Sequence, residues 1–164
     1  MIINRALLTN GISQTFEEAI DFSNVQFDPN HIKTINECIV KATATDYESI
    51  LRIVLNIKAT VIGVCSYSLE DVELKLNIKD ELDFTDDEND ENCYYEKGNL
   101  INLDEYVLGI VLANVPVRII KKGAKMPKDG SDYRVISEET YNQEKENSHD
   151  SRWDILDSVK ISDD

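Results

Sequence analysis

Apolar and polar residues alternate along two long stretches in the middle of the chain. Every second position is apolar from Ile53 to Cys65, and after a short turn the alternation resumes from Val72 to Ile78. A period of two is typical of strands with one face on a core and the other in water. The sequence therefore predicts strands over residues 51–65 and 70–84.

A third strand is predicted immediately before these two. Cys38, Val40, Ala42 and Ala44 share one face over residues 34–45, and the short connection after residue 45 leads into the next strand. Strands connected this locally pair in antiparallel fashion. The three form an up-down meander, and a weaker alternation over Phe16–Phe22, followed by a turn signal at residues 28–30, predicts a first strand before them.

A helix is expected after the strands, from about Leu103 to Asn114. It is apolar nearly all round, which is typical of a helix buried against a sheet. Asn102 and Glu105 have the spacing of a capping box, and Val115–Pro116 ends the helix because proline lacks the amide hydrogen. Short strands are expected on either side, over residues 100–102 and 117–120.

The C-terminal part is expected to be polar and mobile over residues 138–150. An amphipathic helix then follows, with Asp150 as its N-cap and Trp153, Leu156 and Val159 on one side. The whole pattern predicts an α+β fold: an antiparallel β-meander sheet packed by a buried helix, with a short C-terminal helix. The length of 164 residues favours one domain over residues 1–164.

An acidic segment interrupts this pattern. Asp80–Glu91 carries eight carboxylates and no basic residue. A calcium loop of the EF-hand type starting at Asp86 would have Glu91 where glycine is needed and Lys97 where the bidentate glutamate is needed. The sequence instead predicts a solvated, mobile connection over residues 80–98, because like charges at this density repel one another.

Composition narrows the class of protein further. The net charge is −15, which works against association of the whole surface with nucleic acid and suits contact with basic proteins. The longest apolar run, residues 107–117, is interrupted and far shorter than the ~20 residues of a membrane helix. With no signal-peptide pattern at the N-terminus, a cytoplasmic location without membrane contact is expected.

The residues offer little catalytic or metal-binding chemistry. No phosphate-binding glycine loop or hydrolase motif is present, and the two histidines, His31 and His149, lie in turn-like or polar contexts. Cys38 and Cys65 fall on apolar strand faces, where a thiol is most simply a small buried hydrophobe. Cys65 is the one candidate nucleophile, and nothing beside it in the sequence lowers its pKa. We expect no enzyme activity, cofactor, metal or small-molecule substrate.

A basic cluster provides the best candidate for a contact surface. It places five positive charges within eleven residues: Arg118, Lys121, Lys122, Lys125 and Lys128. These side chains could contact RNA phosphates, although no aromatic residue lies among them to stack on bases. The alternative is that they neutralise the chain's own acidic segments, and the sequence leaves both interpretations open.

The order of these features resembles the YceD family, the large ribosomal RNA subunit accumulation proteins. The similarity begins with the Phe-x-x-x-Ile-Asp-Phe-Ser segment at Phe16 and continues with Cys65, Leu69 and Val72, which resemble the family's Cys-x-Arg-x-Leu-x-x-Val core. The acidic segment, an apolar helix and a step at Val115–Pro116 follow. Asp150 and Arg152, with Leu156, resemble the family's closing Asp-Pro-Arg-x-x-x-Leu.

The sequence departs from the family pattern in two places. Tyr67 stands where the family has arginine, so a role of that arginine is not carried over. Many members also have a cysteine cluster after the Leu-Pro step, whereas residues 117–133 here contain neither cysteine nor histidine. A structural zinc needs four such ligands, so no metal is expected at this place.

The resemblance implies a role in the synthesis, processing or stability of bacterial 23S ribosomal RNA, with no known catalytic step. The expected partner is a large-subunit ribosomal precursor, through a ribosomal protein, its RNA, or both. An acidic adaptor or chaperone for an unrelated basic protein is the alternative. An enzyme acting on RNA would need a site that the sequence does not display.

Overall fold

The computed structural model describes residues 1–147 of the chain. They fall into two compact units, of which the first is Met1–Lys125 and the second begins at Met126. The first unit contains every strand and the helix α1, and the second contains the helix α2 (Glu138–Asn147). Among the described residues, no helix has the length and hydropathy needed to span a membrane.

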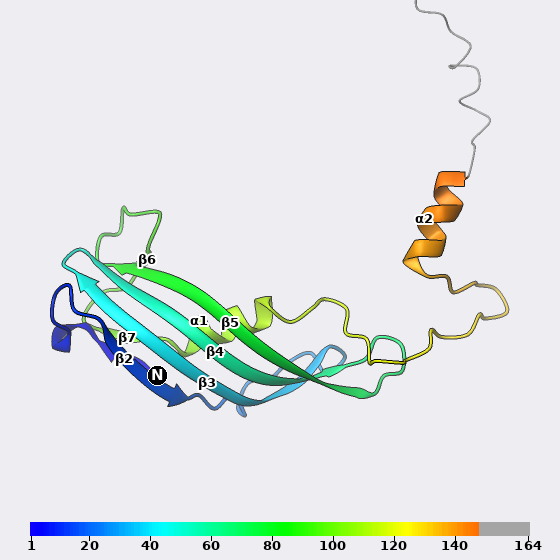
Figure 1. Ribbon diagram of the computed structural model, residues 1–164, viewed down its shortest axis with the longest axis horizontal. Helices are drawn as coiled ribbons and strands as arrows, with labels where there is room; N and C mark the ends of the chain where they lie inside the picture. The colour runs from blue at the N-terminus through cyan, green and yellow to red at the C-terminus, as the bar shows by residue number, and fades with distance from the viewer. Residues whose placement is uncertain (148–164) are drawn as a thin grey trace, which may run out of the picture. The chain divides into compact units, whose positions relative to one another are not determined.

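A five-stranded sheet forms the body of the first unit. Its strands are β2 (Gln14–Ala19), β3 (Ile32–Tyr47), β4 (Ile50–Val64), β5 (Asp71–Thr85) and β6 (Tyr94–Tyr95), side by side in that order. β2 to β5 pair in antiparallel fashion, and β6 adds to the end of β5 in parallel. The three long strands run together as one curved layer (Figure 1). The predicted meander and the α+β fold are confirmed.

A smaller second sheet and a helix complete this unit. β1 (Ile2–Asn4) pairs with β7 (Leu100–Asn102), and the short 3₁₀ helix η1 (Arg5–Leu7) follows β1. The helix α1 (Asp104–Ala113) comes directly after β7 and contacts β4 and β5. The sequence predicted β7 and α1, whereas β1 was not foreseen.

The core lies on one face of the sheet, as the alternation predicts. The inward residues of β4 are almost inaccessible to solvent, including Leu51, Ile53, Leu55 and Ile57, while Arg52, Val54 and Lys58 between them are exposed. Burial of apolar side chains at about 25 cal/mol per Å² is the main contribution to the stability of such a sheet. The outer face remains in water.

β3 begins earlier than the alternation predicted. The pairing of β3 with β4 shifts register between Ile32 and Thr34 and again between Ile35 and Glu37. A bulge places two residues opposite one and changes which residue faces the core. Ile32, Ile35 and Cys38 are therefore all buried although they lie three residues apart.

The helix α1 is buried along one side only. Leu103, Val107 and Val111 are inaccessible to solvent, whereas Gly109 and Leu112 are exposed. The predicted packing of the helix against the sheet is confirmed, and its other side faces solvent although it is largely apolar. The expected capping box is also replaced by a different contact. Leu103 is the N-cap residue without a side-chain hydrogen bond, and Oδ1 of Asn102 accepts the N–H of Asp104 at 3.1 Å.

Three other expectations change with the structure. Residues 117–120 form no strand. The acidic connection begins only after Thr85, because β5 extends through Asp80 and Asp83. Residues 138–147, predicted only to be polar and mobile, form the helix α2, which was not foreseen and has no buried residue. The helix expected from Asp150 lies outside the described residues, and the single domain over residues 1–164 stays a prediction.

Candidate partner-binding surfaces

The segment that follows α1 is attached to the end of the β4–β5 hairpin. The N–H of Ser66 donates to the carbonyl of Ile119 at 2.8 Å, and the Ile119 side chain is buried. Gly63 on β4 makes room for it, since a Cβ at that position would overlap Cδ1 of Ile119. Residues 117–120 are thus fixed by one hydrogen bond and one buried side chain rather than by strand pairing.

The thiol of Cys65 forms a further attachment between the same two segments. Its Sγ accepts the N–H of Lys121 at 3.3 Å and the N–H of Ser68 at 3.4 Å. The N–H of Lys121 foremost, and then the hydroxyl and the N–H of Ser68, lower the pKa of Cys65 to about 7. This pKa shift could not be predicted from the sequence, because the main donor lies 56 positions away along the chain.

Burial limits what the thiols can do. The side chain of Cys65 is 0% exposed, and Cys38 is buried on β3, where burial raises the pKa of its thiol to about 11. The prediction that both are buried is confirmed, and Cys38 is the small hydrophobe that was expected, whereas the sulfur of Cys65 also accepts hydrogen bonds. In the structure, Cys65 acts as a hydrogen-bond acceptor that holds the backbone of Lys121, and no reagent reaches it in this conformation.

His31 also belongs to this attachment. Its Nε2 lies 3.1 Å from the carbonyl oxygen of Pro116 and donates when that nitrogen carries the proton. The carbonyl of His31 accepts the N–H of Val64 at 2.9 Å. The expected surface position is therefore only partly exposed, and the imidazole serves the packing of the segment.

The five basic residues of the sequence-predicted cluster have different surroundings. Nζ of Lys121 lies 2.9 Å from Oε2 of Glu70, which makes an ion pair and lowers the pKa of that carboxyl. Within residues 1–147, the other four have no ion pair or hydrogen bond: Arg118, Lys122, Lys125 and Lys128. The interpretation that the basic residues neutralise the chain's own acidic groups therefore applies to Lys121. We call Arg118, Lys122 and Lys125 the free basic residues; Lys128 belongs to the second unit.

Exposed apolar residues lie close to this basic segment. Leu69 at the β4–β5 turn is 75% exposed and adopts a φ of 59°, and Val117 is 94% exposed. A left-handed conformation is uncommon for a residue with a branched side chain. Tyr67, which stands at the family's arginine position, lies half-buried in the same turn. The hairpin end is thus a mixed basic and apolar surface.

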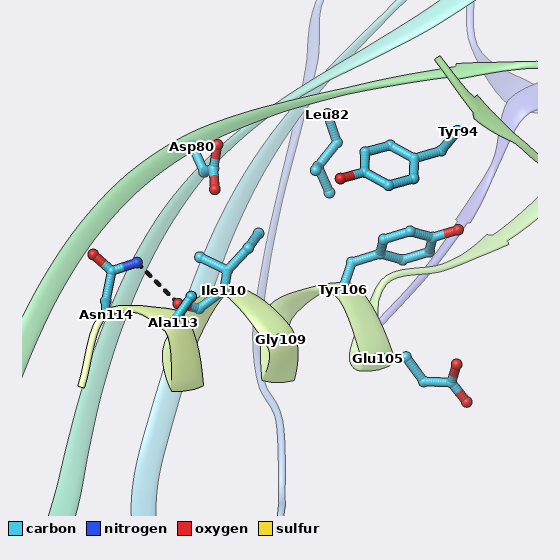
Figure 2. A pocket seen from close by; sticks show the side chains of 9 residues that line it. All are labelled: Asp80, Leu82, Tyr94, Glu105, Tyr106, Gly109, Ile110, Ala113 and Asn114. Atoms are coloured by element: carbon cyan, nitrogen blue, oxygen red, sulfur yellow. Dashed lines mark hydrogen bonds between the residues drawn. The ribbon is translucent and has the colours of Figure 1, made fainter. Parts of the chain in front are cut away.

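A separate pocket of about 500 Å³ lies between α1 and the β5–β6 end of the sheet. Three aromatic rings meet at one side of it, with the centroid of Tyr106 5.1 Å from the centroids of both Phe84 and Tyr94. Phe84 is buried, while Tyr94 is 49% exposed. In Figure 2 the ring of Tyr94 lies above the ring of Tyr106, and the two are arranged edge to face. Leu82 lies between Tyr94 and Asp80 in this view.

The environment of Tyr106 keeps its phenol neutral. Its hydroxyl donates to Oε1 of Glu96 at 2.9 Å. Burial first, and the Glu96 carboxylate second, raise the pKa of Tyr106 to about 12. The ring therefore presents an uncharged aromatic surface at any physiological pH.

Asp80 is the residue of this pocket that sequence reasoning overlooked. Even-numbered positions of β5 face the core side and are apolar from Val72 to Phe84, except at Asp80. Its neighbours on that face, Ile78 and Leu82, are buried. The sequence could have indicated this residue, because Asp80 is a carboxylate that interrupts an apolar series.

The acidic connection between β5 and β6 is built from local turns. Oδ1 of Asp87 accepts the N–H of Asn89, and Oδ1 of Asp90 accepts the N–H of Asn92. In the part of the chain that the structure describes, no group of three or more histidine, cysteine or acidic side chains is arranged to hold a metal. Asp150 and Arg152, the last family-motif positions, lie outside this part.

Comparison with known proteins identifies a family. The sequence model of a family described as "Large ribosomal RNA subunit accumulation protein YceD" matches residues 53–160. The matched range begins within β4 and includes Cys65, the pocket and the basic segment. Neither the curated proteins nor the solved structures contain a match.

Proposed function

Because this chain belongs to the YceD family, we propose that it is a non-catalytic factor in biogenesis of the large ribosomal subunit. The family name implies a role in accumulation of the large-subunit ribosomal RNA. The proposed role is to support the synthesis, processing or stability of 23S ribosomal RNA. The family match over residues 53–160 is the observation that carries the proposal.

The distribution of charge supports a mode of action with two contacts. The chain has a net charge of −15, and its acidic surface suits contact with a basic ribosomal protein. The free basic residues, Arg118, Lys122 and Lys125, project from a segment fixed at the hairpin end. Such side chains contact phosphates without reading sequence, which suits RNA binding secondary to a protein contact.

The surroundings of the candidate catalytic groups favour a binding role. Cys65 is buried and its sulfur is engaged by two backbone N–H groups. The imidazole of His31 is engaged by the carbonyl of Pro116. Both side chains stabilise the attached segment, and a factor that works on ribosomal precursors in this way would do so in the cytoplasm.

Sedimentation of ribosomes from cells depleted of this protein tests the proposal. The expected result is a specific deficit of large subunits and of 23S RNA, with 16S RNA unchanged. Normal gradients would contradict the proposal. Capture of the protein with its partners then separates the proposal from its alternative, an acidic adaptor for an unrelated basic protein. Ribosomal components should co-purify only under the proposed role.

A further inference from the structure

The pocket beside α1 combines a carboxylate, two tyrosine rings and an apolar floor. Asp80 points from β5 toward Ile110 and Ala113 of α1, while the hydroxyl of Tyr94 points toward Leu82 (Figure 2). No lysine, arginine or histidine lines the pocket, in a part of the chain that the structure describes completely. The lining therefore has negative charge and aromatic faces, without a cation to neutralise them.

Asp80 remains available for a ligand despite its position among apolar residues. Its Oδ1 accepts the N–H of the adjacent Glu81 at 2.9 Å, and no positively charged group within residues 1–147 pairs with it. Glu81 and Asp83 point to the other face, where both pair with Arg52. Of these three acidic residues of β5, the carboxylate on the α1 side is the one without a cationic partner.

We propose that this pocket binds an arginine side chain from a basic segment of a partner protein. The guanidinium forms a charge-assisted hydrogen bond with Asp80 and stacks against the ring of Tyr94. The aliphatic part of the side chain packs on Leu82 and Ile110. Arginine fits this lining better than lysine, because its planar, weakly hydrated group both stacks on rings and binds carboxylates in a fixed geometry.

The sheet edge beside the pocket can accommodate the backbone of such a segment. β6 pairs with β5 only at Phe84 and Thr85, so the edge of β5 next to Asp80 has no partner strand within residues 1–147. An extended segment lying along a free edge can pair with its N–H and C=O groups. The identity of the partner as a basic ribosomal protein rests on the proposed function; the arginine chemistry of the pocket does not.

An NMR titration of the full chain with a short glycine–arginine–glycine–arginine–glycine peptide tests the proposal. The expected result is saturable shifts at Asp80, Tyr94 and Tyr106. The same peptide with citrulline, the uncharged isostere of arginine, should not produce them. Asp80→Asn and Tyr94→Leu should each weaken binding by about three- to tenfold, because each removes a charge-assisted or cation–π contact.

Two control variants separate the pocket from the general negative charge. Glu17→Gln removes one charge from β2, at the opposite edge of the sheet, and should leave binding unchanged. Glu37→Gln removes one charge from the exposed surface of β3, outside the pocket, and should also leave binding unchanged. Asp80 and Tyr94 are exposed, so neither substitution removes a buried side chain. Equal binding of the citrulline peptide, or wild-type affinity of both pocket variants, would overturn the proposal.

Different experimental results would contradict the arginine-binding pocket and the proposed ribosomal function. A normal ribosome profile after depletion, together with peptide binding that depends on Asp80, removes the ribosomal role and keeps the arginine pocket. A large-subunit deficit, together with peptide shifts confined to the acidic connection of residues 86–93, removes the pocket and keeps the role.

Discussion

The backbone N–H of Lys121 donates to Sγ of Cys65 at 3.3 Å, and this contact joins the basic segment to the β4–β5 hairpin. Two sequence features that looked independent, a family-motif cysteine and a basic cluster, therefore belong to one structural unit. The position of the free basic residues depends on a buried thiol.

The ionisation of the two buried cysteines should affect stability in opposite directions. The pKa of Cys65 is lowered to about 7 from 9.0, so the stability it contributes is full above pH 9 and is lost as the pH falls toward 7. The pKa of Cys38 is raised to about 11, so its contribution is present below pH 9 and is lost as the pH rises through 11. Urea denaturation of Cys65→Ser and Cys38→Ser across this range measures both effects. Identical pH profiles for the two variants would contradict the assignment.

The contact between Gly63 and Ile119 should be sensitive to a single methyl group. Gly63→Ala places a Cβ against Cδ1 of Ile119 and 3.2 Å from the carbonyl of His31, and should cost roughly 1–3 kcal/mol of unfolding free energy. Combining it with Ile119→Val should cost less than the sum of the two changes. Gly109→Ala is the control, since nothing lies within 4 Å of its added Cβ and alanine favours a helix by up to about 1 kcal/mol. Additive decreases in unfolding free energy, measured by urea denaturation, would show that the two residues do not interact.

The sheet could be predicted from the sequence because β4 keeps a period of two throughout and β5 breaks it only at Asp80. The early start of β3 could not, because Ile35 falls out of step with both Ile32 and Cys38, and only the two bulges explain why all three are buried. The strand predicted over residues 117–120 is wrong for a related reason. Burial of Ile119 and a hydrogen bond to Ser66 fix this segment without a neighbouring strand.

The basic segment and the pocket beside α1 differ in how much of each could be predicted from the sequence. The basic residues are contiguous and visible, but their division into the paired Lys121 and the free Arg118 depends on Glu70, which lies 51 positions from Lys121. The pocket brings Asp80 of β5, Tyr94 of β6 and Tyr106 of α1 together only through the fold. Asp80 alone carried a local signal, as the polar exception in an apolar series.

Tyr106 should titrate later than an ordinary tyrosine, with a pKa of about 12. Burial is the larger cause, so Glu96→Gln should lower this pKa without returning it to 10. Because the folded pKa is raised, the associated stability is present at neutral pH and is lost as the pH rises from 10 through 12. The near-ultraviolet absorbance of phenolate, compared between wild type and Tyr106→Phe, isolates this residue. An unchanged late titration in Glu96→Gln would show that the negative charge of Glu96 has no part in it.

Replacement of the basic residues by glutamine should weaken binding to large-subunit precursors. The combined change of Arg118, Lys122 and Lys125 removes the three free basic residues of the first unit. The salt dependence of binding should fall by about 0.7–0.9 in log–log slope for each phosphate that is no longer bound. Lys121→Gln should have a smaller effect, because Glu70 already pairs with that ammonium group. A variant that adds Lys121→Gln and Lys128→Gln to the triple variant replaces every residue of the predicted basic cluster.

A matched triple variant separates a local contact from a change in total charge. Lys41, Lys58 and Lys79 are exposed on β3, β4 and β5, and their replacement by glutamine alters the net charge equally. Precursor binding measured by co-sedimentation at several salt concentrations should fall for the first triple variant and stay at the wild-type level for this one. Because Cys65 and Ile119 hold the basic segment in place, weaker binding confined to the first variant would locate the contact at the hairpin end. Equal binding by both variants would remove the basic segment from the proposed mode of action and leave the acidic body as the contact.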